Sequence, residues 1–176
     1  MIARYNEDIG WTKGLNVPFF IYNKGEALPR EYHSVVEYVE NKGREGETWL
    51  RYIMLNYHNL PDEIAFLQGN PHFHFLDVEN VVNNMTFQDT FPLGDILISD
   101  KDGCPHHCGL TVGLINKELS LPDRDMFEFA AGAQYIVPKK NIINKPPEWW
   151  INAYNIYMKY EHSPWIFERL WKYIFS

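Results

Sequence analysis

The chain has 176 residues, of which 45% are hydrophobic and 22% are charged, and its formal net charge is −7. This size and balance fit one globular domain that can bury a sizeable core. The acidic total disfavours general binding of DNA or RNA, because contacts to nucleic-acid phosphates favour a basic surface. It still permits a small anionic ligand held by local Arg and Lys side chains.

The sequence carries no pattern of a membrane span or a signal peptide. No apolar run approaches the roughly 18 residues that a transmembrane helix needs, and the N-terminus turns polar within its first few residues. We therefore expect a cytoplasmic protein, or one that a partner delivers to its site.

The first half alternates short apolar runs, each ended by a polar turn, with one helix. Apolar residues recur every four positions from Trp49 onward and predict the helix, whereas the short runs predict strands. This order is typical of an α/β fold with a parallel sheet. The predicted strands are Met1–Arg4, Pro18–Tyr22, Ser34–Val39 and Glu63–Leu67, and the helix runs from about Arg44 to about His58.

The second half is less regular. Residues 72–95 are expected to form a loop with a short helix. Apolar runs predict strands at Ile96–Ile98, Leu110–Ile115 and Ala130–Val137. Two further helices are predicted, one from Pro146-Pro147 to about Tyr160 and one that begins at Ser163-Pro164, since Pro suits a first helical turn.

Polar clusters follow the predicted strands of the first half. In parallel sheets, ligands bind beyond the carboxyl ends of the strands. We therefore expect the clusters to converge on one edge of the sheet and to form a binding site there. They are Arg4–Asp8, Asn23–Gly25, Asn41–Arg44 and Gln68–His74.

Two of these clusters have both a functional and a structural interpretation. Arg4–Asp8 could grip a base and ribose, or form a polar turn that caps a helix. Asn41–Glu45 precedes the helix, where free N–H groups and the planar fork of Arg44 suit a phosphate. The alternative is an ordinary cap in which acidic residues complement the helix dipole. The spacing of a P-loop is missing.

Other groups could hold a metal or supply a carboxylate. His72, His74 and Asp77 offer imidazole and carboxylate ligands for a divalent metal, although exposed histidines in an aromatic loop are the alternative. The spacing of Asp100-x-Asp102 suits either a metal pair or a turn, and the turn is favoured. Glu168 on the last helix is either catalytic or part of a solvated face.

The two cysteines flank the segment Cys104-Pro-His-His-Cys108. This pair could form half of a zinc site, but the sequence has no second Cys or His pair with matching spacing. A loop with reduced thiols is therefore expected.

Several motifs together resemble an uncharacterised family of small domains with the pattern NKGRE…LPD…FLQG. They are Asn41-Lys42-Gly43-Arg44-Glu45, Leu60-Pro61-Asp62 and Phe66-Leu67-Gln68-Gly69, and a similar close follows at Gly132–Pro138 and Glu168–Trp171. That family resembles, more distantly, glycosyltransferases of the GT-A fold. Arg4-Tyr5-Asn6-Glu7 is similar to the segment that ends their first strand and contacts the nucleotide.

The resemblance implies a GT-A-like, Rossmann-like single domain, 1–176, with a nucleotide-binding half (1–75) and an acceptor-side half (76–176). It implies a glycosyltransferase that moves a sugar from a nucleotide-diphosphate sugar to a hydroxyl group of a glycan acceptor. The expected donor-site residues are Arg4, Tyr5, Asn6, Glu7, Lys42, Arg44, Gln68 and Asn70. The expected catalytic carboxylates are Asp77, Asp102 or Glu168, and the expected acceptor residues are Gln134, Trp149 and Trp150.

One departure from the GT-A pattern concerns the metal. GT-A enzymes usually place Asp-x-Asp after the fourth strand, where this chain has Gln68-Gly69-Asn70-Pro71-His72. Three alternatives follow: His72, His74 and Asp77 hold Mn²⁺ or Mg²⁺, no metal is used, or activity is lost. The rival functions are a non-catalytic sugar- or nucleotide-binding module and a metal-dependent hydrolase built on those three residues, with His106 or His107.

Overall fold

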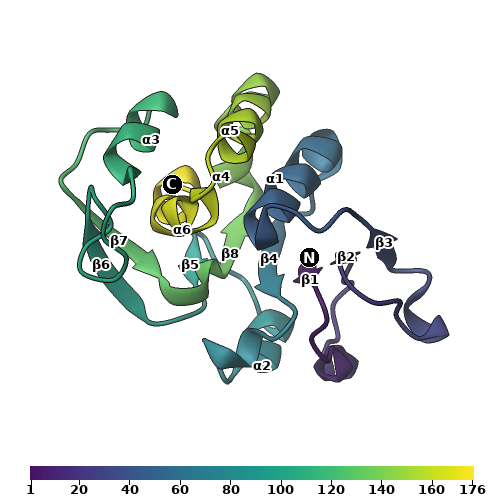
Figure 1. Cartoon of the computed structure of the whole chain (residues 1–176). Helices are drawn as coiled ribbons and strands as arrows, with labels where there is room; N and C mark the ends of the chain where they lie inside the picture. The colour runs from purple at the N-terminus through teal and green to yellow at the C-terminus, as the bar shows by residue number, and fades with distance from the viewer.

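The computed structural model describes all 176 residues and contains a six-stranded mixed sheet in the order β3-β2-β1-β4-β8-β5 (Figure 1). Strands β1, β2, β3 and β4 pair in parallel, whereas β8 runs antiparallel to both β4 and β5. The prediction of an α/β fold with a mostly parallel sheet is therefore confirmed. The strands are β1 (Ile2–Arg4), β2 (Ile21–Asn23), β3 (Val36–Tyr38), β4 (Glu63–Gln68), β5 (Phe91–Pro92) and β8 (Tyr135–Pro138).

Helices cover both faces of this sheet. Figure 1 shows α1 (Arg44–Asn56), α5 (Pro147–Lys159) and α6 (Ser163–Ile174) on one side and the short α2 (Val78–Asn83) on the other. Alternate residues of β4 point to opposite faces. Phe66 belongs to the core under α1, α5 and α6, whereas Ala65 and Leu67 belong to the core against α2.

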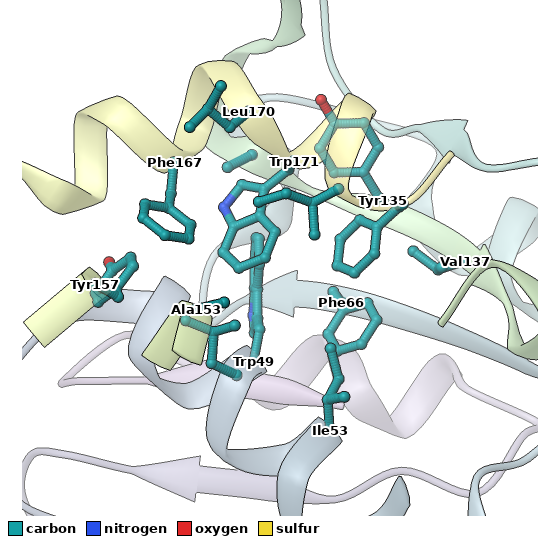
Figure 2. Close-up of a cluster of buried hydrophobic side chains, with 14 of the residues drawn as sticks. Trp49, Ile53, Phe66, Tyr135, Val137, Ala153, Tyr157, Phe167, Leu170 and Trp171 are labelled. Atoms are coloured by element: carbon teal, nitrogen blue, oxygen red, sulfur yellow. The ribbon is translucent and has the colours of Figure 1, made fainter. Parts of the chain in front are cut away.

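The larger core explains the high aromatic content of the chain (Figure 2). Trp49 of α1 lies 5.3 Å from Trp171 of α6, measured between ring centres. Phe66 of β4 stacks on Phe175 with ring centres 5.4 Å apart. These rings are almost completely buried and fill the space between the helices and the sheet. The aromatic excess therefore serves mainly packing, since buried aromatic pairs add to the hydrophobic stabilisation.

The second half departs from two predicted strands. Residues 112–118 form helix α3 (Val112–Glu118), because Val112, Ile115 and Leu119 bury one face at helical spacing. The predicted strand Ala130–Val137 is split by Gly132 and Ala133, whose φ values of 77° and 58° end the extended backbone. The part before the split belongs to a two-stranded sheet of β6 (Ile96–Asp100) and β7 (Met126–Ala130), which packs against α6. The remaining α-helix is α4 (Lys139–Ile143).

The expectation of reduced thiols is wrong, because Cys104 and Cys108 form a disulfide. Gly103 and Gly109 flank the loop with φ values of 85° and 92°, which few other residues adopt. The tight turn brings the two Cα atoms within 4.4 Å of each other, which is within disulfide range. Separately, none of the helices is both long enough and apolar enough to cross a membrane.

A buried ion pair fixes α1 against the sheet. Lys24, which directly follows β2, donates to the carboxylate of Glu47 on α1 over 2.8 Å, and both side chains are almost fully buried. The Lys24 ammonium also donates to the carbonyl oxygens of Lys42 and Arg44. Glu47 in turn accepts from Arg51 and from the hydroxyl of Tyr154 on α5. The carboxyl end of β2 is thereby tied to the first turn of α1.

We predict that Lys24→Met lowers the free energy of unfolding by about 3–5 kcal/mol, because it leaves the Glu47 charge buried without its main partner. Urea unfolding followed by circular dichroism measures this change. The matched control is Lys42→Met, because Lys42 pairs with Glu40 on the surface and should contribute little. Equal effects of the two substitutions would contradict the prediction.

Candidate functional site

A polar cavity of about 310 Å³ lies at the carboxyl edge of the sheet, where β1 and β4 end and α1 begins. Strands β2 and β3 lie on one side of β1, and β4 lies on the other. Ligands of α/β proteins bind where the strand order reverses in this way. The lining residues are Ala3, Arg4, Tyr5, Glu7, Lys24, Asn41, Arg44, Glu45 and Gln68.

The first turn of α1 gives the cavity its electrostatic character. Gly43 precedes the helix with a φ of 65°, and no side chain caps the helix. The first N–H groups of a helix have no acceptor within it, and they carry the positive end of its dipole. A ligand anion in this cavity would therefore meet the positive end of the dipole and the first-turn N–H groups other than that of Glu45.

Arg44 has a strained backbone at the edge of the cavity. Its φ of 46° lies in the left-handed region, which costs a non-glycine residue roughly 1–3 kcal/mol. Its side chain is exposed, and its guanidinium carbon lies 4.8 Å from the ring centre of Trp165 on α6. Among the cations of the lining, Arg44 is the one whose side chain makes no hydrogen bond within the protein.

Glu45 places a carboxylate inside the cavity. Burial raises its pKa, and the nearby Glu168 raises it further. A hydrogen bond to its own backbone N–H and the charges of Arg44 and Lys24 oppose this rise in part. Glu45 was not among the expected site residues, because an acidic residue in a first helical turn is common and usually complements the dipole.

Arg4 lines the cavity and uses Nε and Nη1 of its guanidinium within the protein. Its guanidinium donates to the carbonyl oxygens of Tyr5, Glu7 and Glu26 and to the side-chain oxygen of Asn23 over 2.7 Å. Lys24 is held by Glu47. These buried cations hold the loops around the cavity and contribute their charge to it. All three N–H groups of Lys24 are engaged, whereas Nη2 of Arg4 has no hydrogen-bond partner within the protein.

The other expected donor-site residues divide into two groups. Tyr5, Glu7, Arg44 and Gln68 line the cavity together with Arg4. Asn6, Lys42 and Asn70 lie outside the lining. Asn6 accepts from the backbone of Glu26, Lys42 pairs with Glu40, and Asn70 is exposed at the turn after β4.

A second polar cluster adjoins the tip of β4. The side-chain amide of Gln68 donates to the carbonyl oxygen of Gly132, and the backbone N–H of Gly132 donates to Glu168 over 2.9 Å. The ring of His74 packs so closely on Gly132 that a Cβ atom there would overlap it. Burial lowers the pKa of His74, while the charges of Glu168 and Asp95 act in the opposite direction.

Glu168 is therefore not on a solvated face. It is partly buried, and its second oxygen accepts from Arg169 over 3.1 Å. Glu168 is outside the cavity lining, but of the three expected catalytic carboxylates it is the one whose charge acts on Glu45 of the lining. Asp77 and Asp102 are both exposed and stay outside the lining.

The structure does not assemble the expected metal site. His72 bonds to Glu79 over 2.8 Å, His74 faces Gly132, and Asp77 accepts from Asn80. No group of three or more His, Cys, Asp or Glu side chains could hold a metal ion. These residues thus do not fit the Mn²⁺ or Mg²⁺ that GT-A enzymes usually hold after the fourth strand.

The turn interpretation of Asp100-x-Asp102 is confirmed. The carboxylate of Asp100 accepts from the backbone N–H groups of Asp102 and Cys104, each over 2.9 Å. The Asp100 side chain thus closes the turn after β6 and is not arranged with Asp102 as a ligand pair.

The expected acceptor residues have structural roles instead. Gln134 is completely buried and accepts from the backbone of Gln68 while donating to that of Pro71. Trp150 belongs to the large core. Trp149 donates to the carbonyl oxygen of Leu119. Both tryptophans lie in the first turn of α5, near the amino end of β4 and away from the cavity, because β8 leads the chain back to that edge.

Sequence reasoning missed Ala3, Lys24, Asn41 and Glu45 as individual lining residues. Lys24 and Asn41 lie in polar clusters that were expected at this edge of the sheet, and Glu45 directly follows one of them. The polar clusters predicted which segments meet, because the carboxyl ends of parallel strands lie at the same edge of a sheet. It could not show which side chains face the cavity.

We predict that Glu45→Gln stabilises the protein at neutral pH. A raised pKa means that the folded protein binds the proton of Glu45 more tightly than the unfolded chain does. The stability that this proton adds is present below about pH 4.5 and is lost as the pH rises through the folded-state pKa. The melting temperature of the variant should exceed that of the wild type at pH 7, by about 2–4 °C for each kcal/mol relieved. The difference should shrink as the pH falls towards 4.

The control for this prediction is Glu161→Gln, because this carboxylate is exposed to solvent. Thermal unfolding between pH 4 and 7 compares the three proteins. A Glu45→Gln variant that is less stable than the wild type at pH 7 would show that the carboxylate stabilises the helix start more than burial disfavours it.

The family comparison covers the part of the chain that forms the cavity. A family model described as "Protein of unknown function (DUF3431)" matches residues 1–91, more than half of the 176 residues. This range contains every residue of the cavity lining. No curated protein and no solved structure matches the chain. The expectation of an uncharacterised domain family is confirmed: the chain belongs to the family of proteins of unknown function DUF3431.

Proposed function

We propose that this protein binds a nucleotide-diphosphate sugar in the cavity between β1, β4 and α1 and transfers the sugar to a hydroxyl acceptor, in the manner of a GT-A glycosyltransferase. The observation that carries the proposal is the position of the cavity. It lies at the carboxyl edge of the parallel strands, at the point where the strand order reverses.

The chemistry of the lining suits a diphosphate. The start of α1 offers free N–H groups and a positive dipole end, and Arg44 adds a guanidinium that can bond two phosphate oxygens at once. The exposed ring of Tyr5 stands at the rim, where it could stack on a base. The strain at Arg44 supports a functional role, because such strain is often found at ligand sites.

Glycosyl transfer needs charge stabilisation on the leaving diphosphate and a base for the acceptor hydroxyl. In this proposal Arg44 and the start of α1 stabilise the leaving group. Glu45 accepts the proton of the acceptor, because its raised pKa suits a general base better than that of an exposed carboxylate. Glu168 lies close enough to influence Glu45, and it tunes that base. No step is assigned to a metal.

A non-catalytic nucleotide-binding module is the second candidate. It is favoured by the fully engaged ammonium of Lys24 and by the positions of Asp77 and Asp102 outside the cavity lining. The metal-dependent hydrolase is no longer proposed, because His72, His74 and Asp77 do not assemble into a metal site.

We predict that a nucleoside diphosphate and its sugars raise the melting temperature of the wild type. A ligand that binds only the native state at about 100 times its Kd stabilises it by about 2.7 kcal/mol. A thermal-shift panel of nucleotides and nucleotide sugars, with and without Mn²⁺, measures this effect. Arg44→Ala should lose most of the shift. Arg30→Ala, at an exposed position outside the lining, should keep it.

Turnover of the stabilising nucleotide sugar separates the two candidates. A transferase should slowly hydrolyse or transfer the sugar, and Glu45→Gln should abolish turnover while binding persists. Stabilisation without any turnover in the wild type would favour the binding module. A panel in which no nucleotide shifts the melting temperature would refute both.

A further inference from the structure

The two-stranded sheet of β6 and β7 has an open edge along β6. Figure 1 shows this small sheet at one side of the molecule, apart from the six-stranded sheet. Of the helices and strands, only β7 makes extensive contact with β6, so no strand lies beside the other edge of β6. The cavity proposed for the nucleotide is lined by no residue of either strand.

The hydrogen bonds of β7 show which backbone groups of β6 reach that edge. Ile96 lies opposite Ala130, and Ile98 lies opposite Glu128. The N–H groups of Ala130 and Glu128 donate away from β6, to two tyrosine hydroxyls. In an antiparallel ladder these opposite residues are therefore the non-hydrogen-bonded pairs. It follows that Ile96 and Ile98 direct their own N–H and C=O groups outward.

The two edges of the small sheet differ in how their backbone groups are satisfied. Tyr135 and Tyr173 accept from the outward N–H groups of β7, whereas no group of the chain bonds to those of Ile96 and Ile98. The open edge ends at Asp100, whose N–H donates to a carbonyl oxygen of the disulfide loop. It therefore offers the donors and acceptors of Ile96 and Ile98 to another strand.

The side chains of this edge do not guard it. Ile96 and Ile98 are 47% and 48% exposed, while Ser99 is completely buried on the opposite face of the strand. Edge strands are commonly blunted by Lys, Pro or a bulge. The run Ile96–Ser99 contains no charged residue and no Pro. Unpaired backbone groups beside exposed β-branched side chains form a surface suited to strand pairing.

We propose that β6 pairs antiparallel with β6 of a second copy of this chain. A twofold axis at Leu97 places Ile96 of each copy opposite Ile98 of the other. Both residues direct their backbone groups to the edge, so every free N–H of one copy meets a free C=O of the other. The small sheets of the two copies then join into one sheet in the order β7-β6-β6-β7.

The side chains and charges in this register favour a second copy as the occupant. Each exposed isoleucine lies beside one of the other copy, and β-branched neighbours are favourable cross-strand pairs. The acidic residues do not oppose each other, because Asp95 lies opposite Ser99 of the second copy and Asp100 lies opposite Gly94. This arrangement matters because each chain carries a net charge of −7.

The short length of the open edge determines the expected strength of the contact. The interface is at the low end of the range for specific complexes, below about 1,200 Å². We therefore expect a reversible dimer whose population rises with protein concentration. The inference does not rest on the proposed nucleotide site, since the cavity lies at the ends of β1 and β4.

The test measures association of the full chain and locates the contact. Sedimentation equilibrium over a series of protein concentrations should show a monomer that converts to a dimer. Amide hydrogen exchange is compared at low and high concentration. The N–H groups of Ile96 and Ile98 should exchange fast in the monomer and become protected in the dimer. The N–H of Leu97, which points to β7, should be protected in both.

Variants separate strand pairing from other apolar contacts. Ile98→Pro removes an N–H of the open edge and spares the bonds to β7, since Pro is tolerated where the N–H of an edge strand faces solvent. It should weaken dimerisation by at least about tenfold, because half of the hydrogen bonds across the axis are lost. Ile98→Val keeps the N–H and the branched side chain and should dimerise like the wild type. Circular dichroism verifies that each variant is folded.

A control on a different surface is Phe73→Ser, because Phe73 is 81% exposed and lies in the turn after β4. This substitution should leave dimerisation unchanged. The proposal fails if the wild type stays monomeric at its highest attainable concentration. It also fails if a dimer forms without protecting the N–H groups of Ile96 and Ile98, or if Phe73→Ser dissociates the dimer and Ile98→Pro does not.

Discussion

The buried ion pair between Lys24 and Glu47 is the interaction on which the candidate site depends. The ammonium group of Lys24 donates to two carbonyl oxygens at the start of α1. The carboxylate of Glu47 accepts from Arg51 and Tyr154. One pair of charges thus joins the end of β2, the start of α1 and the middle of α5. A buried charge is costly without its partner, so these elements are held in one arrangement.

That arrangement leaves the start of α1 open towards the ends of β1 and β4. Gly46 allows α5 to approach closely, since a Cβ atom there would lie 2.6 Å from the hydroxyl of Tyr157. The same hydroxyl donates to the carbonyl oxygen of Gly43. Packing from α5 therefore supports the helix start from one side, while Arg44 and Glu45 face the cavity on the other.

The sequence predicted the location of the candidate site better than its members. Polar clusters at strand ends indicate an edge of a parallel sheet, and Tyr5, Arg44 and Gln68 meet there as expected. Whether a cation is free depends on the acceptors that surround it. Arg4 donates to Asn23 and to the carbonyl oxygen of Glu26, and Trp150 lies in the core. Neither contact can be predicted from the local sequence pattern.

By itself, the sequence determined the α/β character of the first half, because short apolar runs and a helix of regular period need only local order. It also determined the edge of the sheet at which polar groups gather. Only the tertiary structure decided that β8 enters the sheet antiparallel and that residues 112–118 form a helix. It alone brought His162 beside His107. These features arise from packing between segments that are far apart in the chain, and a short apolar run is compatible with either a strand or a helix until its neighbours are known.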